Sequence, residues 1–153
     1  MDPYDKEKTR QIWKRVLGEE ETPVCALDSA ALRTWIAEKK TDACTYEALA
    51  RQAPAGRELL RRLGREARCH ARRLEAVYYL WTGEAAEAVS GPLPRQESLC
   101  AALRARHRAE LEAAQRFRRA AEELPEFRAA FLDLAAAAER NASALLCLMQ
   151  RYV

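Results

Sequence analysis

Four polar side chains interrupt stretches of apolar residues that have helical periodicity. Lys39, His70, Glu110 and Asn141 each lie near the middle of a face that is otherwise apolar or built of small residues. Carboxylates and imidazoles are common metal ligands, whereas an ammonium group can neutralise a buried carboxylate. The sequence therefore raises two chemical interpretations, a metal site within a helical protein and a metal-free ion pair.

A second histidine lies close to Glu110 on the same predicted helix, in the reversed pattern His107-x-x-Glu110. If the helices carrying His70 and His107 are parallel, the two imidazoles lie about 9 Å apart along the axis, at about 1.5 Å of rise per residue. One ion held at about 2 Å by each ligand cannot bridge that gap. A weak mononuclear site made of His70 and Glu110 stays open as an alternative.

Helices must position these residues, and the pattern predicts an all-α fold. Capping residues, prolines and apolar periodicity predict four long amphipathic helices, over residues 29–51, 54–82, 94–123 and 125–151. A short helix with Ile12, Trp13 and Val16 on one face is expected before them, ending near Gly18. The chain is thus predicted to comprise an N-terminal helix and linker over residues 1–27 and a four-helix bundle over residues 28–153, in a single domain overall.

The lengths of the joints predict how the helices are connected. The first and last joints are tight, so the first two helices and the last two helices should form antiparallel hairpins. The middle connection of roughly twelve residues can extend about 40 Å, which is also the length of a helix of about 27 residues. It could cross the whole bundle and relate the hairpins by a pseudo-twofold axis, or it could form a local turn.

The chain resembles the ferritin-like superfamily, in particular small bacterial proteins of the rubrerythrin type. Nearly the whole sequence takes part in this resemblance, which rests on the segments Ile12–Val16, Asp42–Ala50, Arg68–Leu74, Tyr79–Gly83, Glu110–Phe117 and Leu134–Leu146. It implies a ferritin-like four-helix bundle with a di-iron site at mid-height. Such sites take one glutamate from each of two helices and a Glu-x-x-His motif from each of the other two.

The positions that match this ligand pattern have mostly lost their ligands. The first glutamate falls on Lys39, and the first Glu-x-x-His falls on Ala67 and His70. The second glutamate is Glu110, and the second Glu-x-x-His falls on Ala138 and Asn141. Two of six ligands survive, so the resemblance implies a degenerate site. Three glutamates, Glu38, Glu66 and Glu139, lie one position away, which turns them about 100° around the helix and out of the core.

The residues that remain predict a metal-free polar cluster. Lys39 is expected to pair with Glu110, and His70 and Asn141 to complete hydrogen bonds around them. A buried lysine without a partner would be strongly disfavoured. We therefore predict no cofactor and no metal ligand set, with iron as the alternative and His70 and Glu110 as its surviving ligands.

Composition excludes several functional classes. The net charge is +3, and the basic residues are interleaved with acidic ones, which disfavours nucleic-acid binding. The arginine series Arg61, Arg65, Arg68 and Arg72 is expected to form a solvated face. No stretch is long and apolar enough for a membrane span, and the five cysteines contain no C-x-x-C pair, so we expect reduced, structural thiols in a cytoplasmic protein.

The leading functional hypothesis is a non-catalytic bundle that acts as a structural or interaction protein, with a second copy or another protein as its partner. One alternative is a di-iron oxidoreductase of rubrerythrin type, acting as a peroxidase or a ferroxidase. Another is a binder of a metal or small molecule in the space that Ala67 and Ala138 would leave.

Overall fold

The computed structural model describes residues 27–152, and this part of the chain is all-helical. Its four long helices are α2 (Ser29–Gln52), α3 (Arg57–Thr82), α4 (Leu99–Glu123) and α5 (Arg128–Met149). Three short 3-10 helices, η1 (Pro54–Gly56), η2 (Pro125–Phe127) and η3 (Gln150–Tyr152), adjoin them. The prediction of an all-α protein with four long helices is confirmed. The expected N-terminal helix with Ile12, Trp13 and Val16 lies outside the described residues.

Capping side chains set the starts of α2 and α4, and a glycine sets the end of α3. The Asp28 carboxylate accepts a hydrogen bond from the Ala31 amide at 2.7 Å, and α3 ends at Gly83, whose φ of 78° lies in the left-handed region. The predicted start of the third helix at Pro94 is wrong. Ser98 caps α4 instead by accepting from the Ala101 amide at 3.1 Å, and Pro94 lies in the preceding connection, where its fixed φ is equally suited to extended backbone.

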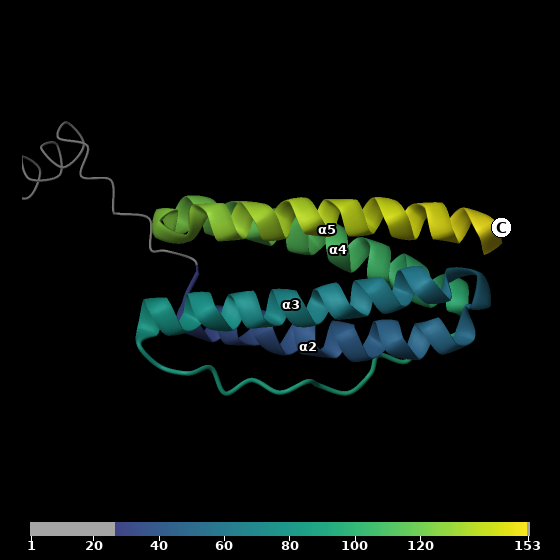
Figure 1. The fold of residues 1–153 in the computed structure, drawn as a ribbon, viewed down its shortest axis with the longest axis horizontal. Helices are drawn as coiled ribbons and strands as arrows, with labels where there is room; N and C mark the ends of the chain where they lie inside the picture. Colours follow the sequence, from purple (N-terminus) through teal and green to yellow (C-terminus); the bar gives the residue numbers. More distant parts are fainter. Residues whose placement is uncertain (1–26, 153) are drawn as a thin grey trace, which may run out of the picture.

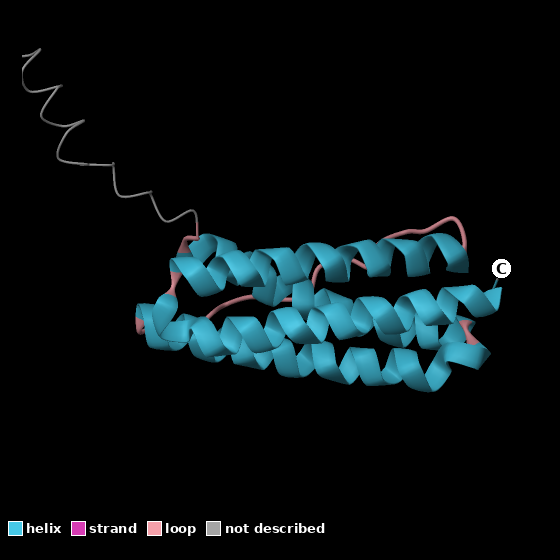
Figure 2. Ribbon diagram, turned by 90° about the horizontal axis from the view of Figure 1, so that it is seen from above, coloured by secondary structure: helices cyan, strands magenta, loops and turns pink. Residues whose placement is uncertain are grey.

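The helices pack as two hairpins, α2 with α3 and α4 with α5. The connection between α3 and α4 runs along α2 from one end of the bundle to the other, as the two views in Figure 1 and Figure 2 show. Lys40 donates to the carbonyl oxygen of Ala88 at 2.7 Å, and the Gly91 amide donates to Thr41 Oγ1 at 2.7 Å. The connection therefore crosses the bundle instead of making a local turn, and α3 and α4 point in the same direction.

The two hairpins repeat one pattern of buried residues with an offset of 71 positions. Pro54 in the first joint corresponds to Pro125 in the second joint. Corresponding pairs of buried residues include Leu32 and Leu103, Ala43 and Ala114, Tyr46 and Phe117, Leu60 and Phe131, Ala67 and Ala138, Leu74 and Leu145. Residues at these corresponding positions are buried in both hairpins, so the two hairpins can be compared position by position.

The core is divided into two apolar halves with buried charged residues between them. One half surrounds Ile36, Phe117 and Phe131, and the other surrounds Leu63 and Leu103. The buried polar side chains are Lys39, Asp42, Thr45, Arg106, Glu110 and Asn141. Since burying a charge is costly unless it is paired, this layer must balance its own charge.

The cysteine side chains are more exposed than the sequence led us to expect. Cys44, Cys69, Cys100 and Cys147 are free and exposed, so they do not act as buried structural thiols, and Cys25 lies outside the described residues. Arg61, Arg65, Arg68 and Arg72 are exposed, as expected. No helix within residues 27–152 combines the length and the apolar character that crossing a lipid bilayer requires.

Candidate functional site

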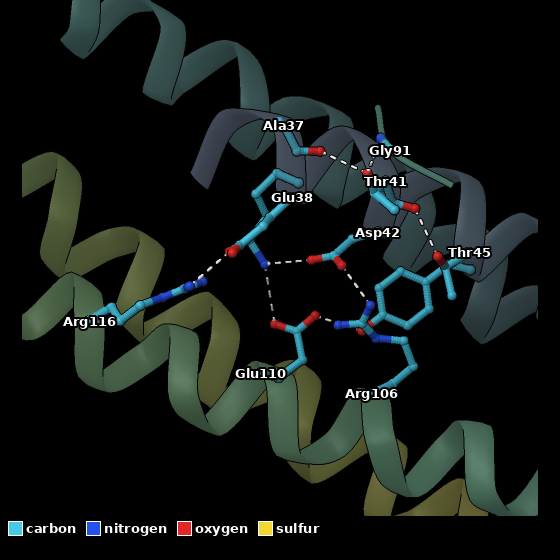
Figure 3. Close-up of polar contacts among 11 residues, drawn as sticks. Ala37, Glu38, Thr41, Asp42, Thr45, Gly91, Arg106, Glu110 and Arg116 are labelled. Atoms are coloured by element: carbon cyan, nitrogen blue, oxygen red, sulfur yellow. Dashed lines mark hydrogen bonds and ion pairs between the residues drawn. The ribbon is translucent and has the colours of Figure 1, made fainter. Parts of the chain in front are cut away.

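The buried charged layer is centred on Lys39, whose ammonium group lies between the carboxylates of Asp42 and Glu110. Figure 3 labels these two carboxylates and Arg106. The Lys39 Nζ atom is 3.2 Å from Asp42 Oδ2 on the same helix and 3.8 Å from Glu110 Oε2 on α4. Lys39 is 3% exposed and Glu110 is 2% exposed. The side chain of Lys39 therefore does not reach bulk water, and its charge is neutralised inside the bundle.

Arg106 and Tyr46 complete the network across the α2–α4 interface. Arg106 Nη1 donates to Asp42 Oδ1 at 2.6 Å, and the Tyr46 hydroxyl donates to Glu110 Oε1 at 2.6 Å. The guanidinium of Arg106 also lies over the ring of Tyr46, with its Cζ atom 5.3 Å from the ring centroid. Asp42 thus accepts hydrogen bonds from both Lys39 and Arg106. Glu110 accepts one from Tyr46, while its buried Oε2 atom lies 3.8 Å from Lys39 Nζ and accepts no hydrogen bond from the described part of the protein.

Two positive and two negative side chains form this layer, so it has no net charge. Burial raises the pKa of Tyr46 well above its usual value, and the neighbouring Glu110 carboxylate raises it further. Burial alone would lower the pKa of Arg106, yet Asp42, Tyr46 and Glu110 together raise it. Tyr46 therefore stays a neutral donor and Arg106 stays a cation.

His70 and Asn141 do not join this network by hydrogen bonds. His70 is half-buried, and its pKa is lowered from 6.5 to about 4 by burial and by the positive charges of Lys39, Arg73 and Arg140. The amide nitrogen of Asn141, oriented towards its acceptors, donates to Glu66 Oε2 at 2.9 Å and to the Ala137 carbonyl at 3.3 Å. The structure thus brings Lys39 and Glu110 together but places His70 and Asn141 beside the network.

The alanines at the other two ligand positions are buried, with Ala67 3% and Ala138 1% exposed. Two of the three glutamates one position away from expected ligands point outwards. Glu38 pairs with Arg116 at 2.7 Å, and Glu139 pairs with Arg118. Glu66 is half-exposed and reaches Asn141. These carboxylates therefore do not converge on the middle of the bundle.

No three His, Cys, Asp or Glu side chains within residues 27–152 are grouped so that they could hold a metal ion. Glu110 and Asp42 are the two buried carboxylates, and Lys39 lies between them, where a cation would otherwise be needed. The arrangement offers ion pairing and hydrogen bonding, which fix the position of α2 against α4.

Three members of the network, Asp42, Tyr46 and Arg106, were not predicted as parts of it. Asp42 lies three positions after Lys39, a spacing that places both side chains on one side of a helix. Arg106 precedes Glu110 by four positions, which is the same signal on α4. Each spacing places two opposite charges on one side of a helix, and this much was visible in the sequence.

Comparison of the chain with protein-family models, with curated proteins and with solved structures finds no match. The likeness to ferritin-like proteins thus stays a prediction based on the residues given above. The fold and the charged layer are established from this chain's own residues.

The ion pair of Lys39 can be tested by two variants. Lys39→Met should lower the free energy of unfolding by roughly 3 to 5 kcal/mol, because it leaves Glu110 buried with Tyr46 as its remaining partner. Adding Glu110→Gln should recover most of this loss, since a neutral amide still accepts from Tyr46 and leaves no unpaired charge at position 110. Chemical denaturation measures both values. Lys40→Met, which removes a half-exposed lysine that pairs with Glu75, is the control and should cost at most about 1 kcal/mol. Equal losses for the two lysines would contradict the pairing.

The pKa of His70 predicts a pH dependence of stability. Because the folded pKa of about 4 lies below the unfolded value of 6.5, the unfolded chain binds the proton more tightly. The contribution of His70 is complete above the unfolded pKa and is lost as the pH falls towards the folded pKa. The total loss should be about 3 kcal/mol at most. His70→Gln should remove this part of the slope while other titrating groups act equally in both proteins. Parallel stability curves for parent and variant would show that the pKa of His70 is not lowered by folding.

Proposed function

We propose that the protein is a ferritin-like bundle in which a charge-neutral layer of side chains takes the place of a di-iron site, and that it acts as a structural or interaction protein. The supporting observation is the position of Lys39 Nζ between the carboxylates of Asp42 and Glu110. In a di-metal bundle, carboxylates at mid-height are held together by the metal ions between them. Here a lysine supplies the positive charge, so the bundle needs no ion to bring the helices together.

The internal repeat explains why this replacement works. Lys39 and Glu110 occupy corresponding positions of the two hairpins. The same correspondence relates Ala67 to Ala138 and His70 to Asn141. Identical acidic residues at the first pair of positions would repel each other without a metal, whereas a lysine and a glutamate attract. The alternative, a di-iron oxidoreductase or iron-binding protein of rubrerythrin type, would have to bind iron through His70 and Glu110. No third carboxylate or imidazole of the described part of the chain is grouped with these two residues.

The interaction role has a candidate surface on the outer side of the second hairpin. Leu111 and Leu146 are 42% and 47% exposed there. The corresponding residues of the first hairpin are Lys40 and Glu75, which form an ion pair at 2.6 Å beside the connection that crosses α2. A face that is charged and partly covered in one hairpin is therefore apolar and uncovered in the other.

The second copy of this chain is the partner that fits this surface best. Arg61, Arg65 and Arg72 are exposed on the first hairpin, so two copies meeting by that face would repel. Their counterparts on the second hairpin are the uncharged residues Leu132, Ala136 and Ser143. A symmetric dimer joined through the α4–α5 faces would bury its leucines against each other. The exposed charges Arg118 and Glu139 of this face already pair with each other. Such a protein would work in the cytoplasm without a cofactor.

Metal analysis separates the two candidate functions. The purified protein is incubated with ferrous iron without oxygen, desalted and analysed for iron. We expect no stoichiometric retention, because the described residues contain no ligand set. The matched control is the double variant His70→Ala with Glu110→Gln, which removes the surviving ligands. Two equivalents of iron on the parent that are lost from the variant would establish the di-iron alternative.

The dimer can be tested by charging its surface. Leu111→Lys combined with Leu146→Glu copies the ion pair of the first hairpin, and it should convert a dimer into a monomer in sedimentation velocity experiments. Leu80→Lys, at a leucine that is 71% exposed on α3, is the control and should leave the dimer intact. A parent protein that is monomeric at high concentration would overturn the proposed dimer, and the iron measurement would be unaffected by that result.

A further inference from the structure

A surface pocket between α2 and α3 is lined by charged residues alone. Its lining residues are Glu47, Arg51, Arg61, Arg65 and Arg68, and its volume is about 400 Å³. Glu47 pairs with Arg68, whereas Arg51, Arg61 and Arg65 form no ion pair within the described part of the chain. Four arginines against one glutamate leave an excess of three positive charges in this pocket.

The internal repeat shows that the fold does not require this concentration of charge. At the offset of 71 positions, the counterparts of the five lining residues are Arg118, Glu122, Leu132, Ala136 and Glu139. These include one cation and two anions, so the same positions of the second hairpin have an excess of one negative charge. Like charges placed close together repel each other, and the second hairpin forms the same helices without them. The arginines of the first hairpin therefore call for a role other than folding.

The basic surface continues beyond this pocket along α3. Arg68 also lines a neighbouring pocket of about 370 Å³, together with Arg72 and the ion pair of Lys40 and Glu75. Arg61, Arg65, Arg68 and Arg72 follow one another at spacings of four, three and four residues, which places them on one side of the helix. This row is about 16 Å long at about 1.5 Å of rise per residue. Its shape suits an elongated ligand with negative charges along its length.

The side chains of the two pockets define the chemistry of this ligand. The guanidinium of arginine presents a planar fork of donors that matches phosphate oxygens, and the first pocket contains arginines without any lysine. All four of its arginines are exposed, so their guanidinium groups can turn towards a bound anion without breaking buried contacts. Single-stranded nucleic acids are held by stacking of their bases on aromatic rings. Among the described residues, no aromatic side chain lines either pocket. The ligand should therefore be a phosphate compound that is polar throughout.

We infer that the basic surface of the first hairpin binds a linear chain of condensed phosphate groups, with the pocket around Arg61 and Arg65 as its main site. This site goes beyond the proposed structural role. It uses the outer face of α2 and α3, and it depends neither on the charged layer around Lys39 nor on the α4–α5 dimer face. A dimer joined through α4 and α5 would carry one such site on each copy, on the hairpin that stays outside the interface.

Four probes test the inference on the full-length protein by isothermal titration calorimetry at low salt and without magnesium. Tripolyphosphate is the linear condensed phosphate, orthophosphate is its single unit, citrate is a carboxylate with several charges, and a short duplex DNA carries phosphates on a helical surface. Tripolyphosphate should bind at least about tenfold more tightly than orthophosphate, because it contacts several arginines at once. Citrate and the duplex DNA should bind more weakly than tripolyphosphate. The affinity for tripolyphosphate should fall as salt is added, because the pocket is exposed to solvent.

Variants locate the site and separate it from the net charge of the protein. Arg61→Leu with Arg65→Ala copies the second hairpin and should weaken the binding of tripolyphosphate by about tenfold or more. Arg33→Ala with Arg140→Ala removes two exposed arginines that do not line either pocket, and it should leave the affinity within about twofold of the parent value. Arg61→Lys with Arg65→Lys keeps both charges but loses the forks, so its affinity should lie between those of the parent and the first variant.

Several results would overturn the inference. They are the absence of binding of tripolyphosphate, an equal affinity for citrate, tighter binding of the duplex DNA, and equal losses in the Arg61/Arg65 variant and in the Arg33/Arg140 control. The substituted side chains are exposed, so all three variants should keep the stability of the parent. The comparison of probes on the parent protein decides the matter even without the variants.

Discussion

The ion-paired contact between α2 and α4 is the constraint on which the structure depends. Lys39, Asp42, Arg106 and Glu110 are four charges that the two apolar halves of the core remove from water. Such a layer is rarely more stable than an apolar one, but it is strongly destabilised when one partner is lost. A register shift of one turn between α2 and α4 would separate Lys39 from Glu110 and Asp42 from Arg106. The layer therefore selects one pairing of these helices, while the apolar halves supply most of the stability.

The internal repeat shows how two facing hairpins can attract each other through residues at corresponding positions. The two hairpins keep the same apolar positions on either side of the layer, and they differ where charge is concerned. Lys39 and Glu110 are opposite charges at corresponding positions, and they pair across the two hairpins. The Glu47–Arg68 ion pair within the first hairpin recurs within the second as Arg118–Glu139, with both signs reversed. Between related elements that face each other, identical charges repel and opposite charges attract. Charge reversal at one of two corresponding positions thus supplies the attraction that a bridging ion would provide.

Much of the fold could be predicted from the sequence, because the apolar periodicity and the prolines at 54 and 125 define the helices directly. The length of the middle connection allowed both a crossover and a turn, and only tertiary contacts such as Gly91 with Thr41 decide between them. The start of α4 was predicted too early because Pro94 and Ser98 are both typical of helix starts. Lys39 and Glu110 stood out as polar residues in apolar faces. Asp42 and Arg106 did not, because each lies at the edge of its face, where only the facing helix determines whether it is buried.

Arg106 is a member of the charged layer that differs in kind from its counterpart in the repeat. Its counterpart is Trp35, whose aromatic ring packs edge-on against Phe117. A guanidinium at this position pairs with Asp42 through Nη1 and covers the ring of Tyr46. A tryptophan at position 106 would leave Asp42 with Lys39 as its single cation, so the charged layer requires a cationic side chain there.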